Sequence, residues 1–436
     1  MLGEMYSTAL TGAAFNWICS PAVTELETIV LDWLARAFGL PECYLSTGPT
    51  NGGGVIHGTA SEAIATVIVA ARDKYLREAT PHIAADDEEG REDAWAERRG
   101  RLVALGSAAT HSATKKGAQI AGVRYRSVPV HAADGYKMTG ASLRTTILEL
   151  RARGLEPFFL TATMGTTDTC AVDDMDSIAD VLAELGPAAG DGGGGGGGPH
   201  GGEVWVHVDA AYAGVALLCP EHRGLVGERA LGRFHSFNTN LHKWLLVNFD
   251  CSVLYVRDRR PLVDALSVTL PILRNRHTDA GLVTDYRDWQ IPFGRRFRSL
   301  KVWFVVRTYG VRGLQAHIRK HVGFAEAFAG LLEGRPDLFE IVTGPRFALT
   351  VFKLKGGGGG GGGGGEGAST TLEEQNALTK KAYELILAEG KIFLSSTVVG
   401  GVYAIRHNPA TPFVEERHVR EHFEIFVEAA EKVLSQ

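Results

Sequence analysis

Two short stretches of the chain place a lysine and an aspartate in settings that suit covalent chemistry. Lys243 lies between the polar run 238–240 and the apolar run 245–247, and Asp209 follows a short apolar strand predicted over 205–208. An ordinary lysine is a solvated surface residue, and a buried one is costly unless its chemistry is used. The pair suits pyridoxal 5′-phosphate (PLP), because its aldehyde forms a Schiff base with lysine and its ring nitrogen pairs with a carboxylate.

Other polar side chains also follow predicted strands. A strand predicted over 102–105 leads to His111, and a strand predicted over 157–163 ends on Thr163. Taken alone, a single histidine in this position is more often structural. Strands alternate with helices from about residue 50 to 256, which indicates a mostly parallel sheet covered on both faces. Ligands bind at the carboxyl ends of such strands, so we expect one group of side chains to converge there. That group is His111, Thr163, Asp209 and Lys243.

The glycine-rich segment 52–63 offers a phosphate site. A dinucleotide fingerprint GxGxxG fails there, because His57 occupies the position of the last glycine. We interpret the segment as a loop that leads into a helix reaching about Tyr75, with Ser61 near its N-cap. Free N–H groups at such a helix start bind anions. A simple capped helix is an equally good interpretation of the segment alone, and Asp209 and Lys243 together favour phosphate.

Composition limits the class of protein. The 436 residues predict two domains, a large one over 1–300 with a mobile loop near 266–283, and a small α+β one over 301–436. Hydrophobic residues make up 45% and charged residues 22%, as in soluble enzymes. A net charge of −5 provides no basic surface for nucleic acid. Five scattered cysteines favour reduced thiols and a cytoplasmic location, with neither a disulfide framework nor a metal site.

Several segments are predicted to stand outside the core. The charged segment 83–100 is interpreted as a solvated, mobile insertion, and the glycine runs 192–198 and 356–365 as loops or linkers. The basic segment 289–301 suits either an anionic group or a plain solvated surface. The amino terminus lacks the features of a signal peptide, and the longest apolar run is too short to span a membrane.

The motifs resemble those of the group II PLP-dependent decarboxylases, and most closely those of the aromatic-L-amino-acid decarboxylases. The resemblance runs from Met1 to the last predicted helix, interrupted by the charged segment and the glycine runs. Five motifs carry it: SPAVTELE at 20–27, GGGVIHGTASEA at 52–63, HVDAAYAG at 207–214, HKWLLVNFDCS at 242–252 and TDYRDWQIPFGRRFRSLK at 284–301.

This resemblance implies PLP fold type I, with a mainly parallel sheet in the large domain, a smaller C-terminal domain, and a homodimer. It implies that Lys243 is the Schiff-base lysine, Asp209 the partner of the ring nitrogen, and His111 the histidine that stacks on the ring. It also implies roles for eight further residues. Ala60, Ser61 and Asn240 correspond to the phosphate cradle, Thr163, Ala211 and His242 to residues around the ring and lysine, and Phe15 and Gly294 to the substrate pocket.

The implied reaction is decarboxylation of an aromatic L-amino acid, of the tryptophan, DOPA or tyrosine class, to the amine and CO2. Two departures matter. Family members usually carry a longer amino-terminal segment that wraps the partner subunit. The family's loop tyrosine, which protonates the carbanion, corresponds here to Ile272, and no tyrosine occurs over 257–284. Two alternatives therefore stay open: an aldehyde synthase that couples decarboxylation to oxidative deamination, and an impaired PLP-binding paralogue. Gly294 corresponds to a position where glycine is associated with indole-type substrates.

Overall fold

The computed structural model describes most of the chain, and contacts divide it into two compact units. The larger unit comprises 1–130, 137–165 and 172–315, and the smaller comprises 131–136, 166–171 and 316–436. The domain boundary predicted at residue 300 falls inside helix α12 (Arg298–Glu333). The described residues are 1–10, 12, 14–81, 83–84, 86–186, 202–268, 276–281, 283–356 and 371–435.

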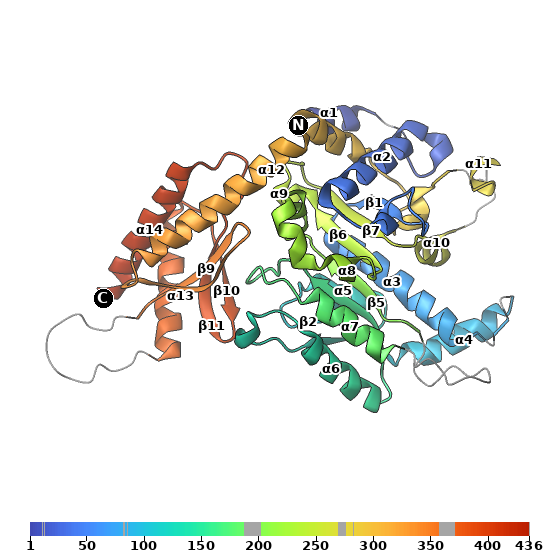
Figure 1. Cartoon of the computed structure of the whole chain (residues 1–436), viewed down its shortest axis with the longest axis horizontal. Helices are drawn as coiled ribbons and strands as arrows, with labels where there is room; N and C mark the ends of the chain where they lie inside the picture. Colours follow the sequence, from blue (N-terminus) through green and yellow to red (C-terminus); the bar gives the residue numbers. More distant parts are fainter. Residues whose placement is uncertain are drawn as a thin grey trace. The chain divides into compact units, whose positions relative to one another are not determined.

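The larger unit is built on a seven-stranded sheet in the order β1-β7-β6-β5-β4-β2-β3 (Figure 1). The five strands from β6 to β3 are mutually parallel, and β7 is antiparallel to both of its neighbours. This confirms the predicted, mostly parallel sheet. All strands except the edge strand β3 are buried along their length, as expected of a sheet covered on both faces. The strands are β1 (Gly53–His57), β2 (Leu102–Ser107), β3 (Arg124–Val128), β4 (Glu156–Thr163), β5 (Trp205–Asp209), β6 (Ser236–Asn240) and β7 (Ser252–Val256).

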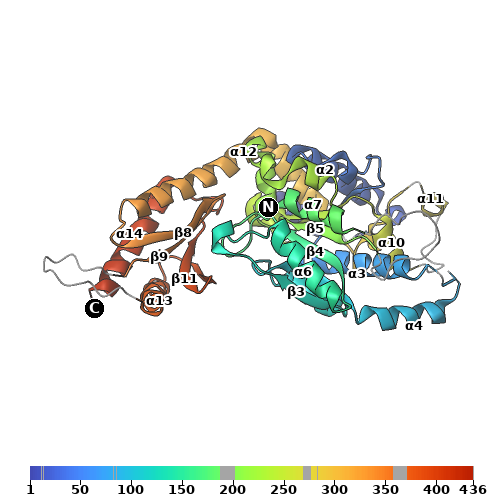
Figure 2. The ribbon, with the colours of Figure 1, turned by 60° about the horizontal axis from the view of Figure 1, so that its bottom comes forward.

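Helices cover both faces of this sheet (Figures 1 and 2). On one face α3 (Ala60–Ala79) is the central element, and its apolar residues share a core cluster with β2, β4 and β7. The same cluster includes α5 (Ala113–Ile120) and α10 (Arg260–Leu266). The other face is covered by α2 (Pro21–Phe38), α6 (Gly140–Ala152) and α7 (Met175–Leu185). Among the helices of the described residues, none combines the length and apolar character needed to cross a bilayer.

The start of α3 agrees with the prediction that Ser61 lies near its N-cap. The N-cap itself is Thr59, since its hydroxyl accepts from the Glu62 N–H at 3.3 Å. Of the glycines before it, Gly53 and Gly54 belong to strand β1, where they serve close packing. A Cβ on Gly54 would lie 2.8 Å from the Tyr255 ring. The S/T-x-x-E pattern of Thr59 and Glu62 was the sequence signal for this cap.

The charged segment 83–100, predicted to be a solvated, mobile insertion, contains a helix that was not predicted. This is α4 (Glu88–Arg99), which Asp87 caps at its start and which has no buried residue. Trp95 packs against the core cluster of α3, and its indole N–H donates to Thr80 at 3.2 Å. Arg98 pairs with buried Glu156 at 2.9 Å. Because most residues of this segment are charged, its sequence did not indicate these few anchoring contacts.

The smaller unit has a four-stranded antiparallel sheet in the order β10-β11-β9-β8. Two helices, α13 (Leu372–Glu389) and α14 (Glu416–Leu434), and the last turns of α12 bury their apolar faces in a core with this sheet. Gly310, at φ +62°, interrupts the helical geometry of α12. The strands are β8 (Phe339–Arg346), β9 (Leu349–Leu354), β10 (Ser395–Val399) and β11 (Val402–His407).

Candidate active site

Three predicted site residues end neighbouring parallel strands at one edge of the sheet. Thr163 is the last residue of β4, Asp209 of β5 and Asn240 of β6. Thr163 and Asp209 are direct partners in the strand register. All three side chains are buried, with exposed fractions of 3 to 4%. The carboxyl edge of the sheet therefore brings the Thr163 hydroxyl and the Asp209 carboxylate together, as the strand pattern predicted, and the Asn240 amide ends the next strand.

Backbone hydrogen bonds fix the Asp209 carboxylate. Its Oδ1 accepts from the Ala211 N–H at 3.0 Å. The Asp209 carbonyl accepts from the Met164 N–H at 2.9 Å, and the Ala211 carbonyl accepts from the Asn240 N–H at 3.0 Å. These bonds join the ends of three strands. Asp209 is thus held in one orientation before any ligand binds.

A chain of buried polar side chains lies under Asp209. His207 Nδ1 is 2.8 Å from Ser236 Oγ, and His207 Nε2 is 2.8 Å from Asn238 Oδ1. An amide oxygen only accepts, so Nε2 carries the hydrogen and Nδ1 accepts from the serine hydroxyl. Burial lowers the pKa of His207 to about 4, although the nearby Asp209 charge and the Asn238 bond raise it. The ring is therefore neutral near pH 7.

Asp173 is a site residue that the sequence reasoning missed. It is buried, and its carboxylate accepts from the backbone N–H groups of Met138 at 2.7 Å and Thr163 at 2.8 Å. Burial raises the pKa of Asp173 to about 7, and the two N–H groups oppose this shift. The only sequence signal for Asp173 was that an acid follows the apolar residues 170–172.

His111 lies beyond β2, before α5. Its Nδ1 accepts from the Ala113 N–H at 3.1 Å, which leaves Nε2 to carry the hydrogen of the neutral ring. The His111 side chain is exposed. The preceding residue, Thr110, has its hydroxyl 3.4 Å from the Thr163 hydroxyl. That contact links the His111 turn to the end of β4.

Lys243 lies in the short helix α9 (Leu241–Trp244), directly after β6, and its side chain is exposed. Its neighbours fix the helix. His242 Nδ1 accepts from the Cys251 N–H at 2.9 Å, and the Trp244 ring stacks on Tyr212 with centroids 5.2 Å apart. Burial lowers the pKa of His242, and the Lys243 charge lowers it further. These contacts anchor the buried side of α9, and Lys243 lies on the exposed side.

The remaining predicted residues fall into two places. Ala60 and Ser61 form the first turn of α3, where Ala60 is buried and Ser61 exposed. Phe15 and Gly294 are brought near each other, because the Phe15 ring lies 5.2 Å from that of Phe293. A Cβ on Gly294 would meet no atom within 4 Å among the described residues. Ile272 lies outside the described residues.

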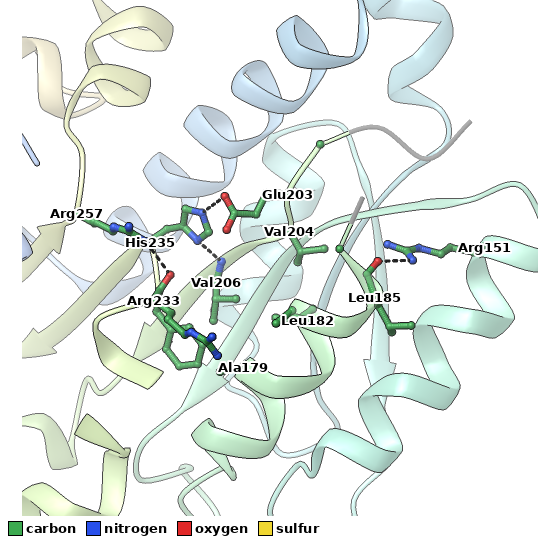
Figure 3. Close-up of a pocket in the computed structure, with 14 residues that line it drawn as sticks. Arg151, Ala179, Leu182, Leu185, Glu203, Val204, Val206, Arg233, His235 and Arg257 are labelled. Atoms are coloured by element: carbon green, nitrogen blue, oxygen red, sulfur yellow. Dashed lines mark hydrogen bonds and ion pairs between the residues drawn. The ribbon is translucent and has the colours of Figure 1, made fainter. Parts of the chain in front are cut away.

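The pocket in Figure 3 lies elsewhere. It is formed at the amino ends of β5 and β6, where Val204 and His235 precede the strands, so it is at the opposite edge from Asp209 and Asn240. His235 Nε2 pairs with Glu203 at 3.3 Å, and its Nδ1 accepts from the Val206 N–H. Among the described residues, no group of three or more His, Cys, Asp or Glu side chains could hold a metal ion.

The side chains at the carboxyl edge fit PLP. A lysine amine on an exposed helix turn and a buried, oriented carboxylate are the groups that its aldehyde and ring nitrogen require. In addition, Asn240 is buried at the end of β6, and its amide nitrogen would donate to the phosphate. The first turn of α3 presents backbone N–H groups suited to a phosphate.

Comparisons with known proteins agree. A family model described as the pyridoxal-dependent decarboxylase conserved domain matches residues 1–355. A phenylacetaldehyde synthase from Arabidopsis thaliana is 41% identical, over 99% of this chain and 79% of the relative. An aromatic-L-amino-acid decarboxylase from Bos taurus is 40% identical, over 100% of this chain and 80% of the relative.

Solved structures show the same relationship. That of Oryza sativa TDC with PLP and tryptamine matches with a TM-score of 0.87 and 36% identity, over 99% of this chain and 81% of that chain. The tryptophan decarboxylase of Catharanthus roseus, in complex with L-tryptophan, has a TM-score of 0.83 and 35% identity, with coverage of 99% and 81%. The chain belongs to the pyridoxal-dependent decarboxylase family and is a PLP-dependent carboxy-lyase.

Proposed function

We propose that this enzyme decarboxylates an aromatic L-amino acid of the tryptophan, DOPA or tyrosine class to the amine and CO2. The observation that carries the proposal is the convergence of Thr163, Asp209 and Asn240 beside the helix that bears Lys243. The names of the relatives, which include tryptophan, tyrosine and aromatic-L-amino-acid decarboxylases, support the substrate class.

Lys243 and Asp209 have the central roles in this proposal. When bound, PLP supplies an aldehyde and an electron-withdrawing ring that stabilises negative charge at the substrate α-carbon. Lys243, on α9, would hold the aldehyde through its Nζ. Asp209, oriented by the Ala211 N–H, would keep a proton on the ring nitrogen through a charge-assisted hydrogen bond.

The other residues bind and orient. His111, oriented by the Ala113 N–H, would cover one face of the ring, and the small side chain of Ala211 would face the other. His242, held by its bond to the Cys251 N–H, would support the lysine. The remaining residues would contact the phosphate, the ring edge or the substrate side chain. They are Ala60, Ser61 and Asn240 for the phosphate, Thr163 for the ring edge, and Phe15 and Gly294 for the substrate.

An aldehyde synthase is the second candidate, and two observations favour it. Ile272 stands where the resemblance places a proton-donating tyrosine, and an isoleucine has no proton to donate. One relative is named as a phenylacetaldehyde synthase. In that reaction dioxygen and water are consumed, and aldehyde, CO2, ammonia and hydrogen peroxide are formed.

Product analysis tests these candidates. The purified chain is incubated with L-tryptophan, L-DOPA and L-tyrosine, and amine, aldehyde, ammonia and peroxide are quantified beside an Ile272→Tyr variant. Amine as the main product supports the decarboxylase. Aldehyde with ammonia and peroxide, changed to amine by Ile272→Tyr, supports the synthase. PLP binding without any product would leave the impaired paralogue.

We also propose that the chain forms a homodimer. Helix α1 (Leu2–Ala9) exposes a row of large apolar side chains, with Leu2, Met5 and Tyr6 each 58 to 60% exposed. Exposed apolar patches of this kind mark contact surfaces. α1 itself is anchored, because Glu4 Oε2 lies 2.8 Å from buried Lys301 Nζ. A second copy of the chain is the partner that the family resemblance suggests.

A further inference from the structure

Three polar side chains lie side by side across the strands β1, β7 and β6. His57 is the direct register partner of Ser252, and Ser252 is the direct partner of Asn240. Opposite residues in antiparallel strands project to the same face with Cβ atoms about 5 Å apart. The exposed fractions are 0% for His57, 0% for Ser252 and 4% for Asn240. The three therefore form a continuous buried polar row.

Each member of this row has a polar atom with no hydrogen-bond partner in the described part of the chain. The atoms are His57 Nε2, Ser252 Oγ and Asn240 Oδ1. A buried polar atom without a partner is costly, and three of them in adjacent register positions call for an explanation other than packing. They do not bond one another in this structure, but their adjacent register positions make each the neighbour available to the next.

Glu62 terminates the row on the side of α3. Its Oε1 lies 3.3 Å from His57 Nδ1, and its Oε2 accepts from the Gly58 N–H at 2.9 Å. Burial raises the pKa of Glu62, but His57, the Gly58 N–H and Arg298 together lower it below its usual value. An ionised carboxylate only accepts hydrogen bonds, so His57 Nδ1 carries a hydrogen.

The row leads to the proposed phosphate site. His57 ends β1, three residues before Ala60 in the first turn of α3, and Asn240 directly precedes the helix of Lys243. Asn240 can serve a phosphate only by donating from its amide nitrogen, since both the phosphate and the amide oxygen are acceptors. Its Oδ1 must therefore point away from the phosphate, towards a donor within the protein.

We propose that Glu62, His57 and Ser252 form a hydrogen-bonded chain that orients the Asn240 amide to donate to the cofactor phosphate. The Ser252 hydroxyl donates to Asn240 Oδ1, and its lone pair accepts from His57 Nε2–H. Both ring nitrogens of His57 then carry hydrogen, and the Glu62 carboxylate offsets the charge. His57, Ser252 and Glu62 are positioning residues, and this inference rests on the phosphate cradle proposed above.

The experiment compares PLP with pyridoxal, which lacks the phosphate. Each ligand is titrated into the full chain stripped of cofactor, and dissociation constants are measured from absorbance. The variants are Ser252→Ala, His57→Leu and His57→Gln. Thr350→Val is the control, because Thr350 is equally buried but lies in the smaller unit. Ser252→Cys, which keeps the side-chain volume, replaces Ser252→Ala if that variant does not fold.

The orientation chain predicts that Ser252→Ala and His57→Leu weaken PLP binding about tenfold, the loss of one hydrogen bond to a charged group. Pyridoxal binding should change less than about twofold, and His57→Gln, whose amide nitrogen has two hydrogens to donate, should regain most of the PLP affinity. Equal losses for both ligands, or unchanged PLP binding, would overturn the inference. If the unaltered chain bound PLP and pyridoxal with equal affinity, the proposed phosphate cradle itself would be contradicted.

Discussion

The carboxylate of Glu27 and the guanidinium of Arg295 form an ion pair of 2.6 Å with side chains only 1% and 3% exposed. Glu27 Oε1 also accepts from the Ile56 N–H at 2.8 Å, and Arg295 donates to the Ile56 carbonyl at 3.2 Å. The pair thus joins α2, β1 and the segment before α12. Because β1 leads directly into the first turn of α3, the pair holds the strand that positions the proposed phosphate site.

Removing one partner of this pair should destabilise the larger unit. Glu27→Ala leaves the Arg295 charge buried, which costs about 3–5 kcal/mol in free energy of unfolding. Urea unfolding followed by circular dichroism measures the change. Glu184→Ala is the control, because Glu184 pairs with Arg144 on the surface, and it should have little effect. Equal effects of the two substitutions would contradict the role given to Glu27.

Asp173 should control the position of Thr163. The link runs in both directions, since the Asp173 N–H also donates to the Thr163 carbonyl at 2.9 Å. In Asp173→Asn only one oxygen can accept, so either Thr163 or Met138 loses its partner. We expect a loss of about 1–3 kcal/mol in stability and weaker PLP binding. Normal PLP affinity in a destabilised Asp173→Asn protein would show that Asp173 serves the fold alone.

The buried His207 should make the cofactor-free protein sensitive to acid. Its pKa is about 4 in the folded chain and about 6.5 when unfolded, so its contribution is present above pH 6.5 and is lost as the pH falls through 4. His207→Gln lacks this titration. From about pH 7.5 to about pH 5, the stability of the unaltered chain should fall relative to the variant by about 2 kcal/mol. Parallel stability profiles would contradict a buried neutral histidine.

Much of the site could be predicted from sequence because a parallel sheet places its strand ends on one edge. The residues that end β4 and β5, Thr163 and Asp209, needed only the apolar strand pattern to be located. The residues that hold these two in position could not be found from the strand pattern. Asp173 acts on Thr163 from a loop, and its role depends on burial and on two backbone N–H groups that no local pattern encodes.

The errors also have physical causes. The charge of segment 83–100 masked a helix held by Trp95 and Arg98, since helical stability there comes from a few tertiary contacts. The glycines before His57 suggested a phosphate loop, whereas a Cβ on Gly52 would lie 1.9 Å from the Cys43 carbonyl oxygen. Those glycines are required by close packing.

The exposed face of α1 should contribute to dimerisation. A homodimer predicts a solution mass of about twice the 46.8 kDa of one chain. Met5→Glu places a charge on the apolar row and should shift the protein towards monomer in size-exclusion chromatography with light scattering. Thr145→Glu, on an exposed position of α6, is the control. A monomeric unaltered chain would refute the dimer, and a dimeric Met5→Glu protein would place the contact elsewhere.

The most direct test of the account is the covalent attachment site of PLP. The full chain is loaded with PLP, reduced with borohydride, digested and analysed by mass spectrometry. The account predicts a pyridoxyl group on Lys243, and loss of that group together with the visible absorbance band in Lys243→Ala. Modification of another lysine, such as Lys115 or Lys116 near His111, or an unchanged band in Lys243→Ala, would contradict it.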